Sequence, residues 1–324
     1  MKKTCKLENI ERENIRLDKY LTEVLEVSRN QIEHLIKSGN VRVDGNSVLK
    51  RSYKIKTDNS IEIEFPEKRE VESEYEVDFD IPVIYEDDYL MVINKPENII
   101  VHTAPSVKEA TVVDWLKKRG VSLSTINGDE RHGIVHRLDK GTTGAMIIAK
   151  DNETHKALSL QLEKREMGRY YLAISDIPLK DDIIIEAPLD RNPRNRLKMA
   201  VVENGRYAKT LFKKYLPSRD SKEELILCKL FTGRTHQIRV HLETLKRHII
   251  GDVLYGFKSK KGKIESVLLH AHTIYFKHPV TGEYLHIEAK INKSMLSYIN
   301  KKFLLELEND KIKNLHNFFN SDSN

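Results

Sequence analysis

One aspartate near the middle of the chain stands among residue types that suit a reactive carboxylate. Asp139 lies between Arg137 and Lys140, and two glycines follow it before the apolar run 145–149. Basic side chains can bind phosphate groups, and glycine lets the backbone approach a ligand closely or adopt positive φ. The apolar run has the composition of a buried strand, which would anchor the loop. The arrangement predicts an aspartate presented at a site for an anionic ligand.

Two other interpretations of the same segment have to be weighed. Asp139 could pair with Arg137 or Lys140 on an ordinary surface turn. Alternatively, His132, His136 and Asp139 have the spacing His-x3-His-x2-Asp, which would place three metal ligands on one face of a helix. The glycines, the β-branched residues between the histidines and the two neighbouring cations disfavour a helical metal site. We therefore expect no metal and no cofactor.

Several segments occur in an order that carries a family resemblance. His136-Arg137-Leu138-Asp139 is followed by Lys140-Gly141-Thr142-Thr143-Gly144, and this segment resembles the central motif of the RluA/RluD family of RNA pseudouridine synthases. The similarity covers about residues 81–291. The other segments that resemble the family are Asn94-Lys95-Pro96, Arg169-Tyr170-Tyr171-Leu172-Ala173-Ile174, residues 233–242, residues 251–256 and Leu269-His270-Ala271.

The resemblance implies a reaction and three site residues. Conversion of uridine into pseudouridine breaks the bond between base and sugar, turns the base and rejoins it through carbon, without a redox change. By carry-over from the family, Asp139 is the catalytic carboxylate, Arg239 is the cation that keeps it charged, and Tyr171 lies beside the target base. Aspartate is ordinarily ionised at neutral pH, so it can act without an activating histidine. Attack on the sugar, attack on the base and removal of a sugar proton all remain open.

A uridine in folded RNA must leave its stack before it can react, at a cost of a few kcal/mol. Stacking on the ring of Tyr171 would return about 1–3 kcal/mol of this cost. The resemblance makes Arg137 the candidate that fills the vacated space. The basic loop 191–196 is a candidate for phosphate contacts. The other RNA-binding residues predicted in this part of the chain are Lys95, Arg234 and His236.

The first 66 residues have a pattern of their own. Residues 16–25 carry apolar side chains at helical spacing, and a capping-box pattern at Ser28 and Gln31 begins a second helix that Gly39 ends. Strands are predicted at 41–43 and 61–64, with a tight turn at Asp44-Gly45. This order resembles the S4-type RNA-binding module. Its predicted RNA contacts are Arg16, Arg29, Lys37 and Arg42.

The whole chain then divides into four parts. Residues 1–66 form the S4-type domain, 67–80 an acidic linker, 81–300 the catalytic domain, and 301–324 the end of a final helix and a frayed tail. Strand-like runs at 90–93, 146–149, 170–174 and 225–230 do not alternate regularly with helices. The fold class is therefore predicted to be α+β, with a mixed, largely antiparallel sheet in the catalytic domain.

Charge and composition bear on the partner. The net charge of +6 divides into +2 for residues 1–66, −5 for 67–80 and +9 for the rest. A basic body suits a polyanion, and we expect structured RNA, with large-subunit ribosomal RNA or an assembling large subunit favoured by the S4-type module. Transfer RNA as the substrate, and a noncatalytic role in RNA binding or ribosome assembly, are the alternatives.

The sequence also indicates where the protein works. It shows neither the apolar core of a signal peptide nor a run long enough to span a membrane. Cys5 and Cys228 are too few and too distant to predict a disulfide framework or a zinc site. We expect a cytoplasmic monomer that does not bind a membrane.

Overall fold

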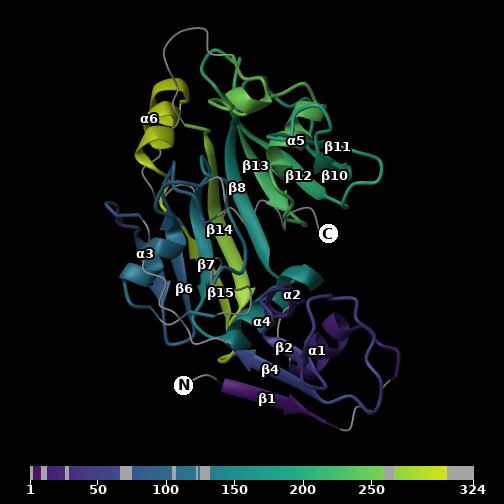
Figure 1. Cartoon of the computed structure of the whole chain (residues 1–324). Coiled ribbons are helices and arrows are strands. Elements are labelled where there is room, and N and C mark those ends of the chain that lie inside the picture. The colour runs from purple at the N-terminus through teal and green to yellow at the C-terminus, as the bar shows by residue number, and fades with distance from the viewer. Residues whose placement is uncertain are drawn as a thin grey trace.

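The computed structural model describes residues 3–8, 13–25, 29–65, 75–103, 107–121, 123–124, 132–258 and 266–304, the side chains of residues 3, 4, 29–31 and 34 excepted. Ser28, most of the predicted linker and nearly all of the predicted tail therefore lie outside the described residues. What is described forms a small N-terminal unit and a larger unit with an extended sheet (Figure 1).

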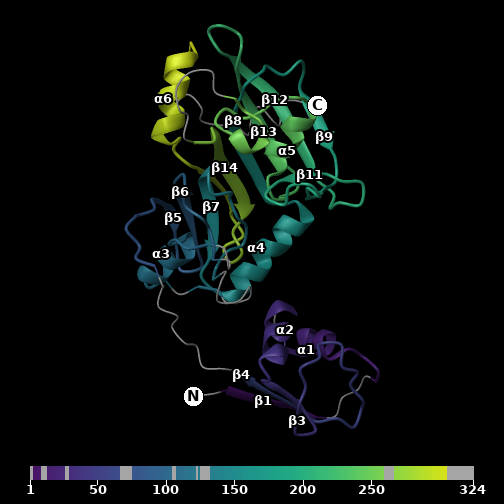
Figure 2. The ribbon, with the colours of Figure 1, turned by 45° about the horizontal axis from the view of Figure 1, so that its top comes forward.

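The N-terminal unit packs two helices against an antiparallel sheet (Figure 2). Its hairpin turns at Asp44 and Gly45, which both have positive φ, as the Asp-Gly pair predicts. Apolar residues of both helices and of the strands form a separate core. The elements are β1 (Lys3–Leu7), α1 (Leu17–Leu25), α2 (Arg29–Lys37), β2 (Val41–Val43), β3 (Asn46–Ser47) and β4 (Ile61–Phe65), with sheet order β1-β4-β2-β3.

The large unit is built on a nine-stranded sheet. Among the described strands, β7 and β14 form the one parallel pair, and every other pairing in this sheet is antiparallel. The predicted α+β class with a largely antiparallel sheet is confirmed. In sheet order the strands are β5 (Val83–Glu86), β6 (Leu90–Lys95), β7 (Thr143–Ala149), β14 (Leu269–Lys277), β8 (Gly168–Ser175), β13 (Glu224–Leu230), β12 (Lys209–Pro217) and β9 (Ile183–Glu186), and β15 (Tyr284–Glu288) pairs with β14.

Helices and a small hairpin surround this sheet. None of the described helices combines the length and the apolarity that crossing a membrane requires. The predicted final helix is α6, which spans Lys293–Lys302. The elements are α3 (Val112–Lys118), α4 (Asn152–Lys164), α5 (Gln237–Thr244), α6 (Lys293–Lys302), the short 3-10 helix η2 (Val253–Tyr255), and the hairpin of β10 (Leu189–Arg191) with β11 (Met199–Val201).

Strand β8 explains how the sheet carries a site on one face. Every residue of β8 is buried, because the sheet has an apolar core on each side. Tyr170 and Leu172 belong to the core that α6 covers, whereas Tyr171 and Ala173 belong to the core on the opposite face. Successive side chains of a strand point to opposite faces, so Arg169 shares the face of Tyr171.

Candidate active site

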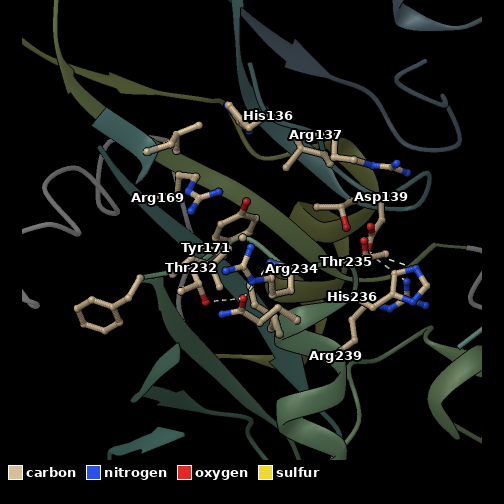
Figure 3. Close-up of a pocket in the computed structure, with 18 of the residues that line it drawn as sticks. His136, Arg137, Asp139, Arg169, Tyr171, Thr232, Arg234, Thr235, His236 and Arg239 are labelled. Atoms are coloured by element: carbon tan, nitrogen blue, oxygen red, sulfur yellow. Dashed lines mark hydrogen bonds and ion pairs between the residues drawn. The ribbon is translucent and has the colours of Figure 1, made fainter. Parts of the chain in front are cut away.

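A cavity of about 690 Å³ opens beside β8, between the loop that precedes β7 and the loop that precedes α5. Asp139, Tyr171 and Arg239, which are predicted from distant parts of the sequence, all line it. Figure 3 shows Tyr171 between Arg169 on one side and Asp139 on the other. The structure thus brings the three residues predicted to be catalytic into one site.

The loop that carries Asp139 is fixed by its own backbone and by one histidine. The carbonyl of Asp139 accepts the N–H of Thr142 at 3.0 Å, which forms a turn just before β7. Nε2 of His136 accepts the N–H of Ile147, a residue of β7, at 3.2 Å. Burial lowers the pKa of His136 to about 3, so this ring is a neutral acceptor. The carboxylate of Asp139 is left 19% exposed, towards the cavity.

Lys95 has a task other than the predicted RNA contact. Its side chain has no exposed surface, and its ammonium donates to the carbonyls of Pro96 and Ile99, at 2.8 Å each, and of Lys140, at 3.1 Å. Burial lowers its pKa to about 7, against the opposing charges of Asp139 and Glu97. Lys95 therefore ties the end of β6 to the loop of Asp139 and does not reach a ligand.

Arg239 stands behind Asp139 and is itself held by a second carboxylate. Its NH1 lies 3.2 Å from Oδ2 of Asp139, while Nε and NH2 form a bidentate pair with Asp252 at 2.7 and 2.8 Å. Burial opposes the charge of Arg239, but the hydrogen bonds and charge of Asp252, followed by the charge of Asp139, raise its pKa. The ring of Tyr255 packs 4.8 Å from the guanidinium carbon. The cation beside Asp139 is therefore rigidly placed.

His236 supplies a further polar group to the carboxylate. It precedes α5 with φ of 56°, and its Nε2 lies 3.8 Å from Oδ2 of Asp139. The hydroxyl of Tyr255 accepts the N–H of Met199 at 2.8 Å and lies 2.8 Å from Nδ1 of His236. Burial lowers the pKa of His236, although the charge of Asp139 opposes this. When the hydroxyl donates to Nδ1, the neutral ring carries its proton on Nε2, facing Asp139.

Tyr171 presents an aromatic ring to the cavity from a rigid strand. The residue is 5% exposed, and burial raises its pKa to about 12, so the phenol is protonated at neutral pH. Its backbone lies opposite Cys228 on β13 and Ala271 on β14. A planar ring fixed in this way can support a base without being ordered at the moment of binding.

The remaining predicted contacts around the cavity are partly engaged. Arg137 is exposed at its rim, and NH1 lies 3.3 Å from Nε2 of His102. Arg234 lines the cavity too, and its Nε donates to the carbonyl of Tyr207 at 2.9 Å. The exposed loop 191–196 connects β10 and β11.

The geometry needed for a metal site is not met around Asp139. Residues 132–140 form turns and irregular backbone, so the helical face proposed for His132, His136 and Asp139 does not exist. Within the described part of the chain, no three His, Cys, Asp or Glu side chains are grouped in a way that would hold a metal ion.

In the S4-type unit, one of the residues predicted to contact RNA is already paired within the protein. Arg16 forms a bidentate pair with the buried Asp18, at 2.9 and 2.8 Å, so its charge is already compensated. Lys37 and Arg42 are exposed and remain predicted RNA contacts. Arg29 begins α2, and its side chain lies outside the described residues.

Asp252 and Tyr255 hold two side chains of the candidate site, and no role is predicted for them from the sequence. They lie in the segment 251–256, which carries part of the resemblance. Both are 1% exposed and connect Arg239 and His236 to η2. In the sequence, Asp252 stands out only as the single acidic residue of the mostly apolar segment 251–256. Nothing in that segment indicates that it pairs with Arg239.

Comparisons with known proteins agree with this geometry. A family model described as RNA pseudouridylate synthase matches residues 89–244, and a model of the S4 domain matches 15–61. An uncharacterized RNA pseudouridine synthase of Helicobacter pylori is 46% identical over 315 residues, which are 94% of this chain and 95% of that relative. Ribosomal large subunit pseudouridine synthase D of Xanthomonas campestris pv. campestris is 36% identical over 293 residues, 86% of each chain.

A solved structure shows the same fold at lower identity. Human RNA pseudouridylate synthase domain containing 4 matches with a TM-score of 0.53 and 23% identity, over 68% of this chain and 92% of that one. The fold, the site and the relatives together define an isomerase that works on RNA. The chain belongs to the RNA pseudouridine synthase family and carries an S4 domain near its N-terminus.

Proposed function

We propose that this protein isomerises specific uridines in structured large-subunit ribosomal RNA, with Asp139 as the catalytic carboxylate. The observation that carries the proposal is the position of Asp139, whose carboxylate faces the cavity 3.2 Å from Arg239 and beside Tyr171. The ribosomal substrate is supported by the S4 domain and by relatives that are named as large-subunit enzymes.

The site supplies what the isomerisation requires from the protein. Arg239 places a cation 3.2 Å from the partly buried carboxylate of Asp139, and the bidentate pair with Asp252 keeps Arg239 from moving away. Tyr171 supports the base after it has left the RNA stack. Arg137, exposed at the rim, is placed to enter the space that the base vacates. Asp139 can then attack the sugar, attack the base or remove a sugar proton.

The substrate is tested by mapping pseudouridines in total RNA from cells with and without the gene. We expect one or more sites in large-subunit ribosomal RNA to be lost and then restored by the wild-type gene. If sites were lost in transfer RNA alone, transfer RNA would be the substrate. If every pseudouridine persisted, the enzymatic proposal would be wrong. An Asp139→Asn gene should fail to restore the lost sites.

A further inference from the structure

The lining of the cavity is rich in arginine. Six arginines line the cavity, and Asp139 and Glu163 are the carboxylates among its described lining residues. Arg165, Arg169, Arg206 and Arg234 line the same cavity, and burial, together with the charges of the other three, lowers the pKa of Arg234. The arginine cluster, as we call it, consists of Arg165, Arg169, Arg206 and Arg234.

Arg169 is the buried member of this cluster. It is 9% exposed, and its Nε has no hydrogen-bond partner among the described residues. None of the ion pairs within the described part of the chain includes it. Burial lowers its pKa, and Tyr171 is the group that acts in the opposite direction. A charge buried without a partner is costly. An anionic ligand that binds in the cavity would supply the partner that Arg169 lacks.

The surroundings leave room for the guanidinium and hold its neighbours in place. A Cβ atom at Gly233 would lie 2.5 Å from NH1 of Arg169, so glycine at this position admits the arginine head group. Tyr207 fixes two other members, because its carbonyl accepts Nε of Arg234 at 2.9 Å and its ring packs 5.3 Å from the guanidinium carbon of Arg165.

Acidic groups near the cluster do not neutralise it. Glu186 is bound by Lys209 at 2.7 Å and by the hydroxyl of Tyr207 at 2.7 Å, which occupies its carboxylate. Glu163 lies on α4 and is exposed to solvent, where pairing contributes little. The four arginines therefore give this part of the cavity lining an excess of positive charge.

We propose that the arginine cluster binds a backbone phosphate of the RNA, next to the uridine that enters the site. This inference rests on the proposed function and assigns the position of a flanking phosphodiester. Arg169 and Tyr171 are two residues apart on the same face of β8, which separates them by roughly 7 Å along the strand. The RNA chain continues past the target uridine, and the exposed Arg165 and Arg206 put the cluster where a phosphate of a neighbouring nucleotide can reach it.

The test compares Arg169→Met with the unaltered arginine, both in a full-length Asp139→Asn background so that binding is measured without turnover. The probe is a transcript of large-subunit ribosomal RNA, titrated over a series of KCl concentrations. Loss of one charged phosphate contact should weaken binding about tenfold or more. The log–log salt slope should become shallower by about 0.7–0.9. The thermal midpoint of the RNA-free protein should not fall, because the substitution removes an unpaired buried charge.

Two further variants sharpen the result. Arg119→Met is the matched control, because Arg119 is paired with Glu86 at 3.0 Å and packs on Trp115, away from the cavity. The salt slope of this variant should equal that of the Asp139→Asn background. Gly233→Ala keeps every charge but pushes on the guanidinium of Arg169, and it should weaken RNA binding in the same direction by a smaller factor.

Each other outcome has a definite meaning. Unchanged affinity and slope in Arg169→Met would refute the phosphate site, and a lower thermal midpoint with an unchanged slope would make Arg169 a structural residue. Calorimetry with inorganic phosphate addresses the other source of the anion. Binding of free phosphate that is lost in Arg169→Met, with RNA affinity unchanged, would also refute the RNA assignment. Failure of the wild type to form pseudouridine would refute the proposed function while leaving these binding measurements interpretable.

Discussion

At the scale of single residues, Asp139 combines access to the cavity with fixed polar groups behind it. Arg239 contacts the carboxylate directly, and His236 faces it at a slightly longer distance. Neither group depends on Asp139 for its own position, since Arg239 is paired with Asp252 and His236 is held by Tyr255. Removal of the charge of Asp139 should therefore leave the site assembled.

This independence makes Asp139→Asn an informative variant. The amide keeps the size of the side chain but loses the charge and the nucleophile, so pseudouridine formation should fall to background while RNA affinity stays within a few-fold of wild type. The control is Asp88→Asn, an exposed position between β5 and β6, which should retain full activity. Substantial turnover by Asp139→Asn would rule out the proposed role. Addition of a strong chelator should not change the wild-type rate.

Tyr171 allows the ring and the hydroxyl to be separated. Tyr171→Phe keeps the stacking surface, so RNA binding should stay within a few-fold of wild type. Tyr171→Leu removes a stacking contribution of about 1–3 kcal/mol, which corresponds to a loss of roughly five- to hundredfold in affinity. Affinity and turnover are measured for both variants to test whether the ring of Tyr171 supports the base. If both behave like the wild type, Tyr171 does not contact the base.

At the scale of elements, a buried histidine connects the side chains of β7 and β14, which also pair in parallel. The hydroxyl of Thr143 lies 2.8 Å from Nδ1 of His270, and Nε2 of His270 lies 3.1 Å from the carbonyl of Ala289. Because the carbonyl can only accept, Nε2 carries the proton, and Nδ1 accepts the hydroxyl. The ring must be neutral to make both bonds, and burial accordingly lowers its pKa to about 4.

This buried histidine predicts a loss of stability in acid. The unfolded chain protonates His270 near its ordinary value of 6.5 and the folded chain only near 4, so the unfolded state binds more protons between these values. The free energy of unfolding should therefore fall as the pH falls from about 6.5 to 4. His270 alone should account for a decrease on the order of 3 kcal/mol. Denaturant unfolding should show a shallower pH dependence for His270→Gln than for wild type. The exposed control His286→Gln should show the wild-type dependence.

The sequence predicts those elements that are locally patterned. The two helices of the N-terminal unit, β8 and β13 follow from apolar spacing, and the ordered motifs correctly place Asp139, Tyr171 and Arg239 together. Strand β1 is not predicted, because its short polar sequence becomes a strand only by pairing with β4, more than fifty residues away. Lys95 is misjudged for a similar reason, since nothing local shows that three carbonyls will surround its ammonium.

At the scale of the whole molecule, the protein has two units with separate cores, and we expect them to contribute differently to RNA binding and to catalysis. Among the described residues, the core of the N-terminal unit lies within residues 5–65, and that of the larger unit begins at Val77. Asp139, Tyr171 and Arg239 all belong to the larger unit. Folding of the larger unit should therefore not require the S4 domain, whereas RNA affinity should.

Deletion of residues 1–66 tests this division. Lys37 and Arg42 are exposed on the deleted unit, and each phosphate contact that they make contributes about 0.7–0.9 to the log–log salt slope. The fragment should bind RNA more weakly, show a shallower salt slope, and still form pseudouridine at high enzyme concentration. Circular dichroism and thermal unfolding establish that it is folded. A folded fragment that is inactive at saturating RNA would show that the S4 domain helps to build the active site, and an unchanged salt slope would show that it does not touch RNA.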